Sequence, residues 1–279
     1  HIVEPDLEAL YRAVVNTELL TAHSSPIEAK VYIIAVPTPV LPDERPNLSY
    51  VFDAVRSIVP VLRAGDLVIL ESTSPVGTTE KISEELALLR PDLTFPHSHQ
   101  NDAHIQIAYC PERVLPGRTM RELVENDRII GGVSYKCGIS AQNFYRNFVE
   151  GDCIVGSARE AELAKIAENA FRDVNIAFAN ELSLVCDRFG INPFRLIQLA
   201  NRHPRVNILN PGPGVGGHCI AVDPYFLISE VPDLTPLMKE ARAVNNLKTE
   251  FVTQKIRSEI AAKGLKKVTC LGLSEKTRS

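Results

Sequence analysis

The segment Val31-Tyr32-Ile33-Ile34-Ala35-Val36 decides the fold, because six consecutive apolar residues, rich in β-branched side chains, predict a strand buried on both faces. Pro37 and Pro39 end this strand. A helix follows, with apolar residues at helical spacing between Val51 and Leu62, and a second apolar strand covers Leu67 to Leu70. Strand, helix and strand in this order are typical of a parallel sheet.

The alternation continues along the chain. Ser72 to Thr79 opens a helix that extends to about Arg90, strands are predicted at Ile105 to Cys110 and Arg128 to Val133, and a helix at Gly138 to Val149 follows. We therefore predict an α/β fold with a doubly wound, Rossmann-like parallel sheet.

Three polar residues lie just past strand ends, namely Thr38, Thr73 and Glu112. Ligands of such sheets bind at the carboxyl ends of the strands, so these residues are candidate ligand contacts. Helix capping or turn formation explains Thr38 and Thr73 equally well.

A long helical region is predicted from about Ser157 to about Arg202. Its apolar residues share one face: Leu163, Ala167, Ala170, Phe171, Val174 and Phe178. Its polar residues share another: Glu162, Lys165, Asn169, Arg172 and Asn180. Exposure to water is the default explanation of a polar helix face, so periodicity alone gives these side chains no role.

The stretch Asn210 to Pro224 contains four glycines and leads into Cys219. Glycine is favoured where the backbone needs positive φ or a close approach to a ligand, so the loop presents Cys219 as a candidate nucleophile. A tight turn with a buried cysteine is the alternative. The other five cysteines read as core residues, and neither they nor the histidines between His97 and His104 have metal-ligand spacing, so we expect no metal site.

A basic connection, Asn201 to Asn207, precedes the glycine loop, and its His203 and Arg205 are candidate anion contacts, with simple solubility as the alternative. After Pro236 a helix extends to about Lys263, and Lys267 to Leu273 predicts the first strand of another sheet.

Composition restricts the class of protein. The 279 residues have a net charge of −4, a pI near 6.0 and no long basic run, which argues against nucleic-acid and membrane-surface binding. No apolar run is long enough to span a bilayer, and we expect a cytoplasmic protein. The chain starts at His1, and both ends look cut, so we expect a piece of a longer protein.

The ordered set of motifs resembles the UDP-sugar 6-dehydrogenases over essentially the whole chain up to Leu273. The motifs are Ala35 to Pro39, Glu71 to Gly77, Tyr109 to Gly117, the helix with Glu162, Lys165 and Asn169, Phe178 to Leu182, and the Cys219 loop. Pro116 and Val222 stand where the UDP-glucose branch usually has glutamate and lysine. These departures favour the branch that oxidises UDP-N-acetyl-D-mannosamine.

The resemblance implies a four-electron oxidation of the sugar C6 alcohol to a carboxylate, with two NAD⁺ reduced in succession. Cys219 would attack the intermediate aldehyde, and the thioester left by the second hydride transfer would be hydrolysed. Lys165 and Asn169 would stabilise the oxyanion and position water, and Glu112 and Asp223 would orient water or transfer protons.

The same resemblance implies the remaining contacts. Residues that would bind the UDP-sugar are Arg113, Val114, Lys165, Asn169, Arg172, His203, Arg205 and Gly216. Thr38 and Thr73 would contact NAD. Independently of the resemblance, the apolar helix face around Phe171 to Leu184 is a candidate dimer element, so we expect a homodimer.

The resemblance also predicts the domains. Residues 1–156 would be an NAD-binding domain without its first βαβ unit, because no strand here leads into a G-x-G-x-x-G turn that opens a helix. Residues 157–264 would be a helical substrate and dimerisation domain, and 265–279 the start of a second, UDP-binding, Rossmann-like domain. A UDP-glucose 6-dehydrogenase and a non-catalytic substrate-binding or dimerising fragment remain the alternatives.

Overall fold

The computed structural model describes residue 4, residues 7–217 and residues 219–269. Contacts divide the chain into two compact units: unit 1 contains His1–Thr38 and Pro46–Lys165, and unit 2 contains Pro39–Arg45 and Ile166–Ser279. The domain boundaries expected after residues 156 and 264 stay predictions.

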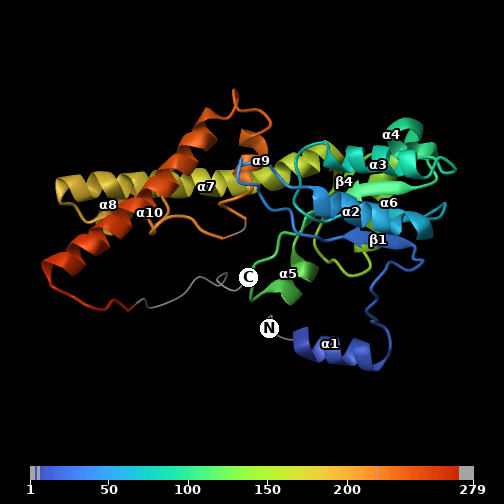
Figure 1. Cartoon of the computed structure of the whole chain (residues 1–279), viewed down its shortest axis with the longest axis horizontal. Helices are drawn as coiled ribbons and strands as arrows, with labels where there is room; N and C mark the ends of the chain where they lie inside the picture. The colour runs from blue at the N-terminus through green and yellow to red at the C-terminus, as the bar shows by residue number, and fades with distance from the viewer. Residues whose placement is uncertain (1–3, 5–6, 218, 270–279) are drawn as a thin grey trace. The chain divides into compact units, whose positions relative to one another are not determined.

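Unit 1 is built on a five-stranded sheet in the order β1-β2-β3-β4-β5 (Figure 1). The strands are β1 Val31–Ile34, β2 Leu67–Leu70, β3 Gln106–Tyr109, β4 Arg128–Gly132 and β5 Cys153–Ser157. The predicted Rossmann-like α/β sheet is confirmed, although β5 was not expected from the sequence.

The prediction of an all-parallel sheet is wrong at one pair. β3 and β4 are antiparallel, with Ala108 opposite Gly132, whereas the other three pairs are parallel. The connection between them carries only α5 (Thr119–Glu125), which has no buried residue. A parallel pair needs a crossover that usually carries a helix packed on the sheet, and α5, which buries no residue, does not form such a layer.

Helices cover both faces of the sheet. α2 (Ser49–Ile58) and α3 (Thr78–Leu89) pack on one face, where Val55, Ile82 and Leu86 join alternate strand residues in one core. α6 (Tyr135–Tyr145) covers the other face with Ala141 and Tyr145. The remaining described helices of the unit are α1 (Leu7–Asn16), η1 (Val59–Val61), α4 (Pro96–His99) and η2 (Gln100–Asp102).

β1 departs from the expectation of a strand buried on both faces. Tyr32 and Ile34 enter the core under α2 and α3, but Ile33, which points to the opposite face, is 44% exposed. β1 is an edge strand of the described sheet, and the contacts of α6 are with β2 to β5. The apolar run is therefore buried on one face and only partly covered on the other, where Val31 packs against the second core.

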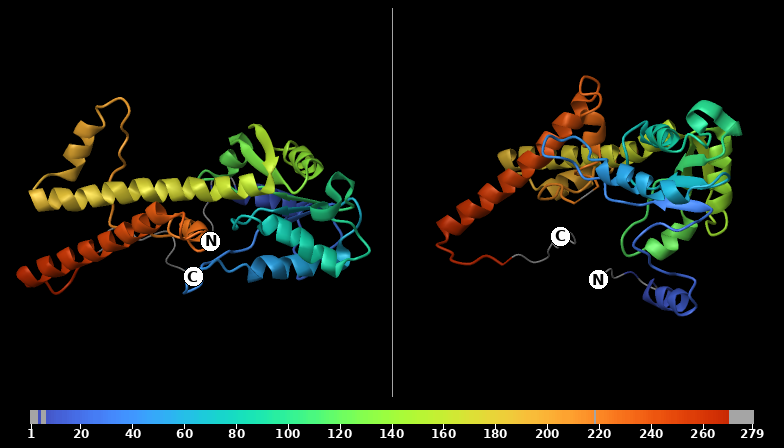
Figure 2. Two further views of the ribbon diagram at one scale, coloured as in Figure 1. Left: turned by 90° about the horizontal axis from the view of Figure 1, so that it is seen from above. Right: turned by 45° about the vertical axis from the view of Figure 1, so that its right-hand side comes forward.

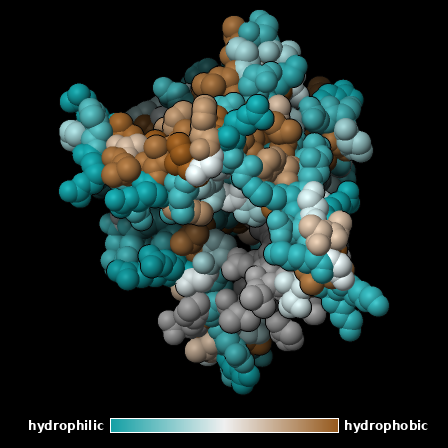
Figure 3. Space-filling model, turned by 90° about the vertical axis from the view of Figure 1, so that its left-hand side faces the viewer, coloured by the Kyte–Doolittle hydropathy of each residue, from teal (hydrophilic) through white to brown (hydrophobic). Residues whose placement is uncertain are grey.

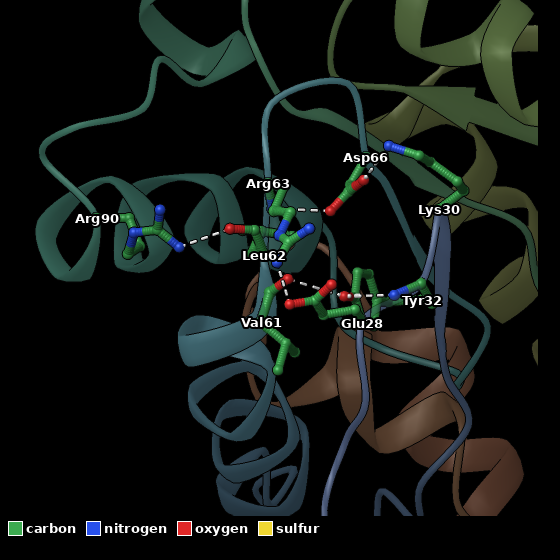
Figure 4. Close-up of polar contacts among 9 residues, drawn as sticks. Glu28, Lys30, Tyr32, Val61, Leu62, Arg63, Asp66 and Arg90 are labelled. Carbon is green, nitrogen blue, oxygen red and sulfur yellow. Dashed lines mark hydrogen bonds and ion pairs between the residues drawn. The ribbon is translucent and has the colours of Figure 1, made fainter.

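Polar contacts fix the chain around the amino ends of β1 and β2 (Figure 4). The buried carboxylate of Asp66 accepts hydrogen bonds from the Arg63 amide at 2.7 Å and the Lys30 ammonium at 3.4 Å. The Tyr32 hydroxyl donates to the Val61 carbonyl at 3.2 Å. These bonds fix the turn at Arg63 to Asp66, which precedes β2. They lie at the amino ends of the strands, away from the carboxyl ends where ligands of such sheets bind.

Unit 2 is helical. The long helix α7 (Ala158–Phe189), which begins in unit 1, is followed by α8 (Pro193–Ala200), α9 (Pro224–Ile228) and α10 (Pro236–Ala262) (Figure 2). Gly190, with φ of +67°, ends α7, and Asn192 caps α8 by accepting hydrogen bonds from the Phe194 and Arg195 amides.

The faces of α7 depart in part from the default expectation, although Arg172 is exposed and Ala170 is buried as expected. The polar residues Glu162, Asn169 and Asn180 are buried, whereas Phe171 is 69% and Phe178 54% exposed. α7 and α10 lie side by side and pair through polar side chains, among them the buried ion pair of Asp173 with Arg242 at 2.7 Å. The seam between these helices is therefore polar.

The strand predicted from Lys267 to Leu273 falls largely outside the described residues. Lys267–Thr269 are described and are not in a strand.

Candidate functional site

Glu162 of α7 caps the amino end of α3. Its carboxylate accepts hydrogen bonds from the amides of Gly77 at 2.6 Å and Thr79 at 2.8 Å and from the Thr79 hydroxyl at 2.6 Å. Burial raises the pKa of Glu162, while these three donors act in the opposite sense. The contact fixes the loop between β2 and α3.

Thr38 and Thr73 come together at the carboxyl ends of β1 and β2. The Thr38 hydroxyl donates to the Thr73 carbonyl at 2.7 Å, and neighbouring Ser72 accepts a hydrogen bond from the Val36 amide at 2.8 Å. The two threonines thus make turn contacts, which was the alternative explanation, while lying at the edge where a dinucleotide would bind. Contact of these two threonines with NAD stays a prediction.

The chain's own G-x-G-x-x-G spacing does not supply the pyrophosphate cradle of such a site. Gly212 to Gly217 has that spacing, but no strand leads into it and α9 begins only at Pro224. A pyrophosphate-binding turn needs the preceding strand and a helix amino end to hold the anion, so this loop has another use.

Lys165 and Glu112 are brought together in unit 1. The Lys165 ammonium donates to the main-chain carbonyl of Glu112 at 2.8 Å, and the Glu112 carboxylate accepts from the Val114 amide at 2.6 Å. The guanidinium of Arg113 donates to the main-chain carbonyl of Asp127 at 3.3 Å. The segment after β3 is thus fixed beside α7. The Lys165 ammonium is hydrogen-bonded to the main chain of Glu112 and not to its carboxylate.

Asn169, Asp223 and Cys219 are brought together in unit 2. The Asn169 amide donates to the Asp223 carboxylate at 2.6 Å, and both residues are buried. The Cys219 carbonyl in turn accepts hydrogen bonds from the amides of Val222 at 3.0 Å and Asp223 at 2.8 Å. The turn that carries the thiol is therefore tied to α7 through one carboxylate.

Cys219 is exposed, unlike the other described cysteines Cys110, Cys137, Cys153 and Cys186. Burial raises the pKa of the Cys110 thiol to about 11, which suppresses its thiolate at neutral pH. Accessibility thus favours Cys219 as the nucleophile and contradicts the alternative of a buried structural cysteine in this loop.

The glycine loop is held at its start by the buried side chain of Asn180. Its carbonyl oxygen accepts from the Gly212 amide at 2.9 Å, and its amide nitrogen donates to Asn245 of α10 at 2.9 Å. Asn245 donates to the Asp173 carboxylate at 2.8 Å, so the ion pair of α7 and α10 is continuous with the loop. This series of hydrogen bonds fixes the position of Gly212, at the start of the glycine loop, relative to α7 and α10.

The glycines of the loop differ in what they require. Gly214 has φ of +138°, and a Cβ there would lie 1.9 Å from the Thr249 hydroxyl, whereas Gly217 has φ of +90°. A Cβ on Gly216 would meet nothing within 4 Å. Gly214 is thus needed for packing, and Gly216 leaves open space of the kind a ligand could use.

The predicted anion contacts are exposed and dispersed. His203, Arg205 and Arg172 lie on the surface, and the His203 ring accepts from the Arg205 amide at 3.3 Å. A cavity of about 850 Å³ beside this segment is lined by Arg195 and Arg202 instead. The described contacts do not join these basic residues to Cys219.

Glu162, Asn180, Asn245 and Asp173 position the site, and sequence reasoning assigned them no role. The one signal was the polar face of α7 with asparagines at mid-helix, where their propensity is poor. A buried polar seam has the same periodicity as a solvated face, so the pattern could not separate the two.

Comparison with known proteins places this geometry in context. The model of the NAD binding domain of the UDP-glucose/GDP-mannose dehydrogenase family matches residues 1–149, and that of the family's central domain matches residues 159–247. None of the described helices is long and apolar enough to cross a bilayer.

Similar proteins extend over nearly the whole chain. An NDP-N-acetyl-D-galactosaminuronic acid dehydrogenase of Ralstonia nicotianae is 56% identical over 99% of the chain, and a UDP-N-acetyl-D-mannosamine dehydrogenase of Escherichia coli is 53% identical over all of it. The chain spans 65% of the length of each. The solved UDP-D-ManNAc dehydrogenase of Pyrococcus horikoshii, 40% identical, superposes with a TM-score of 0.87 over 95% of this chain and 62% of its own. The chain therefore belongs to the UDP-glucose/GDP-mannose dehydrogenase family.

Proposed function

We propose that this chain is part of an NAD-dependent dehydrogenase that oxidises UDP-N-acetyl-D-mannosamine at C6 to the uronate. The observation that carries the proposal is the exposed Cys219 on a turn tied to buried Asp223 and Asn169. The same turn occurs after a glycine loop that Asn180 anchors.

Two NAD⁺ molecules, bound in succession, would each accept one hydride, and the chain's own residues would hold the C6 carbon between these steps. The Cys219 thiolate adds to the C6 aldehyde to give a thiohemiacetal, whose oxyanion Lys165 and Asn169 stabilise. Loss of hydride leaves the Cys219 thioester, and water cleaves it to the carboxylate and the free thiol. Asp223 and Glu112 orient that water or accept its proton.

The choice of sugar rests on Pro116 and Val222, which differ from the UDP-glucose branch, and on similarity to proteins named for N-acetylated sugars. We assign Arg113, Val114, Arg172, His203, Arg205 and Gly216 to the UDP-sugar, and Thr38 and Thr73 to NAD. We also place the protein in the cytoplasm, where nucleotide sugars and NAD are available.

The test uses the protein that carries this chain, with NAD and UDP-N-acetyl-D-mannosamine. We expect two NADH for each sugar, and little turnover of UDP-glucose. In Cys219→Ser the carboxylate should no longer form, whereas Cys186→Ser, at a buried cysteine, should retain activity. Uronate formation at the normal rate in Cys219→Ser would exclude the thioester route, and preference for UDP-glucose would exclude the proposed substrate.

We further propose that the protein forms a homodimer through the apolar face of α7. The exposed residues Phe171, Phe178, Val185 and Phe189 recur at intervals that match a straight α-helix. Figure 3 shows the side of the molecule that lies on the left in Figure 1, where hydrophobic residues are exposed among hydrophilic ones. Such a surface is unfavourable in water unless another protein covers it.

We expect Phe178→Arg to convert the dimer to a monomer, because a charge would have to be buried in the apolar contact. Light scattering after size-exclusion chromatography gives the mass. Leu88→Arg, at an exposed leucine of α3, is the matched control and should stay dimeric. A wild-type monomer, or a dimeric Phe178→Arg, would contradict the proposed interface.

A further inference from the structure

A second cavity lies in unit 2, away from the residues assigned to the reaction. It has a volume of about 380 Å³ and lies between α7, α10 and the first residues of the glycine loop. Its lining is mostly apolar, with Ile191, Pro193, Phe194, Pro211, Pro213, Phe251 and Val252. Its charged lining residues are Asp187, Lys248 and Lys255.

Lys248 is the unusual member of this lining, because it is 8% exposed and has no carboxylate partner among the described residues. Its ammonium donates to the Ser183 hydroxyl at 2.7 Å, which uses one of its three donors. Burial lowers the pKa of Lys248, and the nearby carboxylate of Asp187 opposes this effect.

The charges that face the cavity do not balance. Asp187 forms an ion pair with Lys255, so the two ammonium groups that line the cavity have one carboxylate near them, and it pairs with Lys255. The Phe251 ring lies 5.4 Å from the Lys248 ammonium and 5.5 Å from that of Lys255. A ring face attracts a cation but adds no counter-charge, and a buried cation without one is costly.

We propose that this cavity binds a small organic monoanion, with Lys248 pairing with its acidic group and the apolar lining contacting its body. A single negative charge balances the site, whereas a multiply charged phosphate would leave excess charge against apolar walls. The volume lies within the range of small-molecule sites. The inference is independent of the proposed reaction, because none of Cys219, Lys165 or Asn169 lines the cavity.

Titration calorimetry with benzoate tests this proposal, with benzyl alcohol as a neutral probe of similar size. We expect benzoate to bind the unmodified chain and to bind Lys248→Met at least ~10-fold more weakly, because the charge pair is lost while the aliphatic stem is kept. Lys239→Met, at an exposed lysine of the same helix, should bind benzoate as the unmodified chain does.

Benzyl alcohol should not distinguish the variants. Absence of benzoate binding to the unmodified chain, or equal binding to it and to Lys248→Met, would overturn the proposal. If Lys248→Met fails to fold by circular dichroism, Lys248→Gln replaces it, since it removes the charge and keeps a polar group.

Discussion

At the scale of single residues, the contrast between Cys219 and the buried cysteines determines which thiol can react. The loop exposes one thiol, while packing removes Cys110, Cys137, Cys153 and Cys186 from solvent. All five residues are cysteines, so differences in their reactivity come from exposure and from the surrounding charges.

We therefore expect iodoacetamide to modify Cys219 before the four buried cysteines in the native protein. Peptide mass spectrometry after short exposures measures the order of labelling. Cys219→Ser is the control and should lose the earliest labelled peptide among these five. Modification of Cys110 as fast as Cys219 would contradict the exposed position of the loop thiol.

The glycines of the loop allow a second test at this scale. Gly214→Ala should destabilise the protein by roughly 1–3 kcal/mol, because the new methyl group would overlap the Thr249 hydroxyl and the backbone has positive φ. Gly216→Ala should change stability by less than about 0.5 kcal/mol, because its methyl group meets nothing.

Urea unfolding of both variants gives the two free energies. If the proposed function is right, Gly216→Ala should raise the KM for the UDP-sugar while leaving stability intact. Equal stability of the two variants would show that Gly214 is not a packing requirement.

At the scale of elements, the polar seam between α7 and α10 supports the glycine loop. α7 contributes Asp173, Asn180 and Ser183, and α10 contributes partners for each of them in the same order along the chain, so the two helices run parallel at the seam. Some of its atoms lack partners among the described residues, including Asp173 Oδ2 and Arg242 Nε. These hydrogen bonds fix the register of α7 against α10. Removing one of the polar side chains leaves its partner buried without a hydrogen bond.

Asn180→Ala should therefore destabilise the protein by about 1–3 kcal/mol, because the Gly212 amide and the Asn245 carbonyl oxygen both lose their partner. Thermal and urea unfolding measure the change. Asn175→Ala is the matched control on the same helix, since Asn175 only donates to the Phe171 carbonyl near the surface. A loss no greater in Asn180→Ala than in this control would contradict the anchoring role.

At the scale of the whole molecule, the buried ammonium of Lys248 links stability to pH. Its pKa is lowered in the folded state, so between that value and 10.5 the unfolded chain binds more protons at this site. The free energy of unfolding gains from this group as pH rises through that window. The groups that face it are Asp187, Lys255, Ser183 and Phe251.

We expect Lys248→Met to lose this contribution, so its stability should rise less between neutral pH and pH 10.5 than that of the unmodified chain. Urea unfolding at several pH values measures both curves. Lys239→Met, at an exposed position, should follow the unmodified curve. Parallel curves for Lys248→Met and the unmodified chain would mean that Lys248 titrates normally.

Sequence patterns predicted β1 to β4 well, because short apolar runs that alternate with segments of helical spacing are typical of buried strands. β2 was predicted at its observed bounds, and β1, β3 and β4 were each predicted slightly too long. The direction of β4 and the existence of β5 were not predictable, since strand pairing depends on connections that local composition does not specify.

Sequence reasoning could nominate site residues where chemistry requires a residue type, as at Cys219, Lys165 and Asn169, and their roles stay predictions. The residues that support them could not be nominated in this way. Glu162 and Asn180 act through contacts with residues far away in the sequence, and the polar pattern of α7 gives no sign of what lies against it. Periodicity tells which residues share a face, but the identity of the neighbouring surface determines whether that face is buried.

The cap of α3 by Glu162 determines where a shortened protein that contains only the sheet can end. Protein ending at residue 149 or 156 would contain every strand up to β4 but would lack the carboxylate that holds the Gly77 and Thr79 amides. Its α3 would begin with uncapped donors next to the NAD edge. A stand-alone version of this unit should extend at least through Lys165, so that the first turns of α7 travel with the sheet they support.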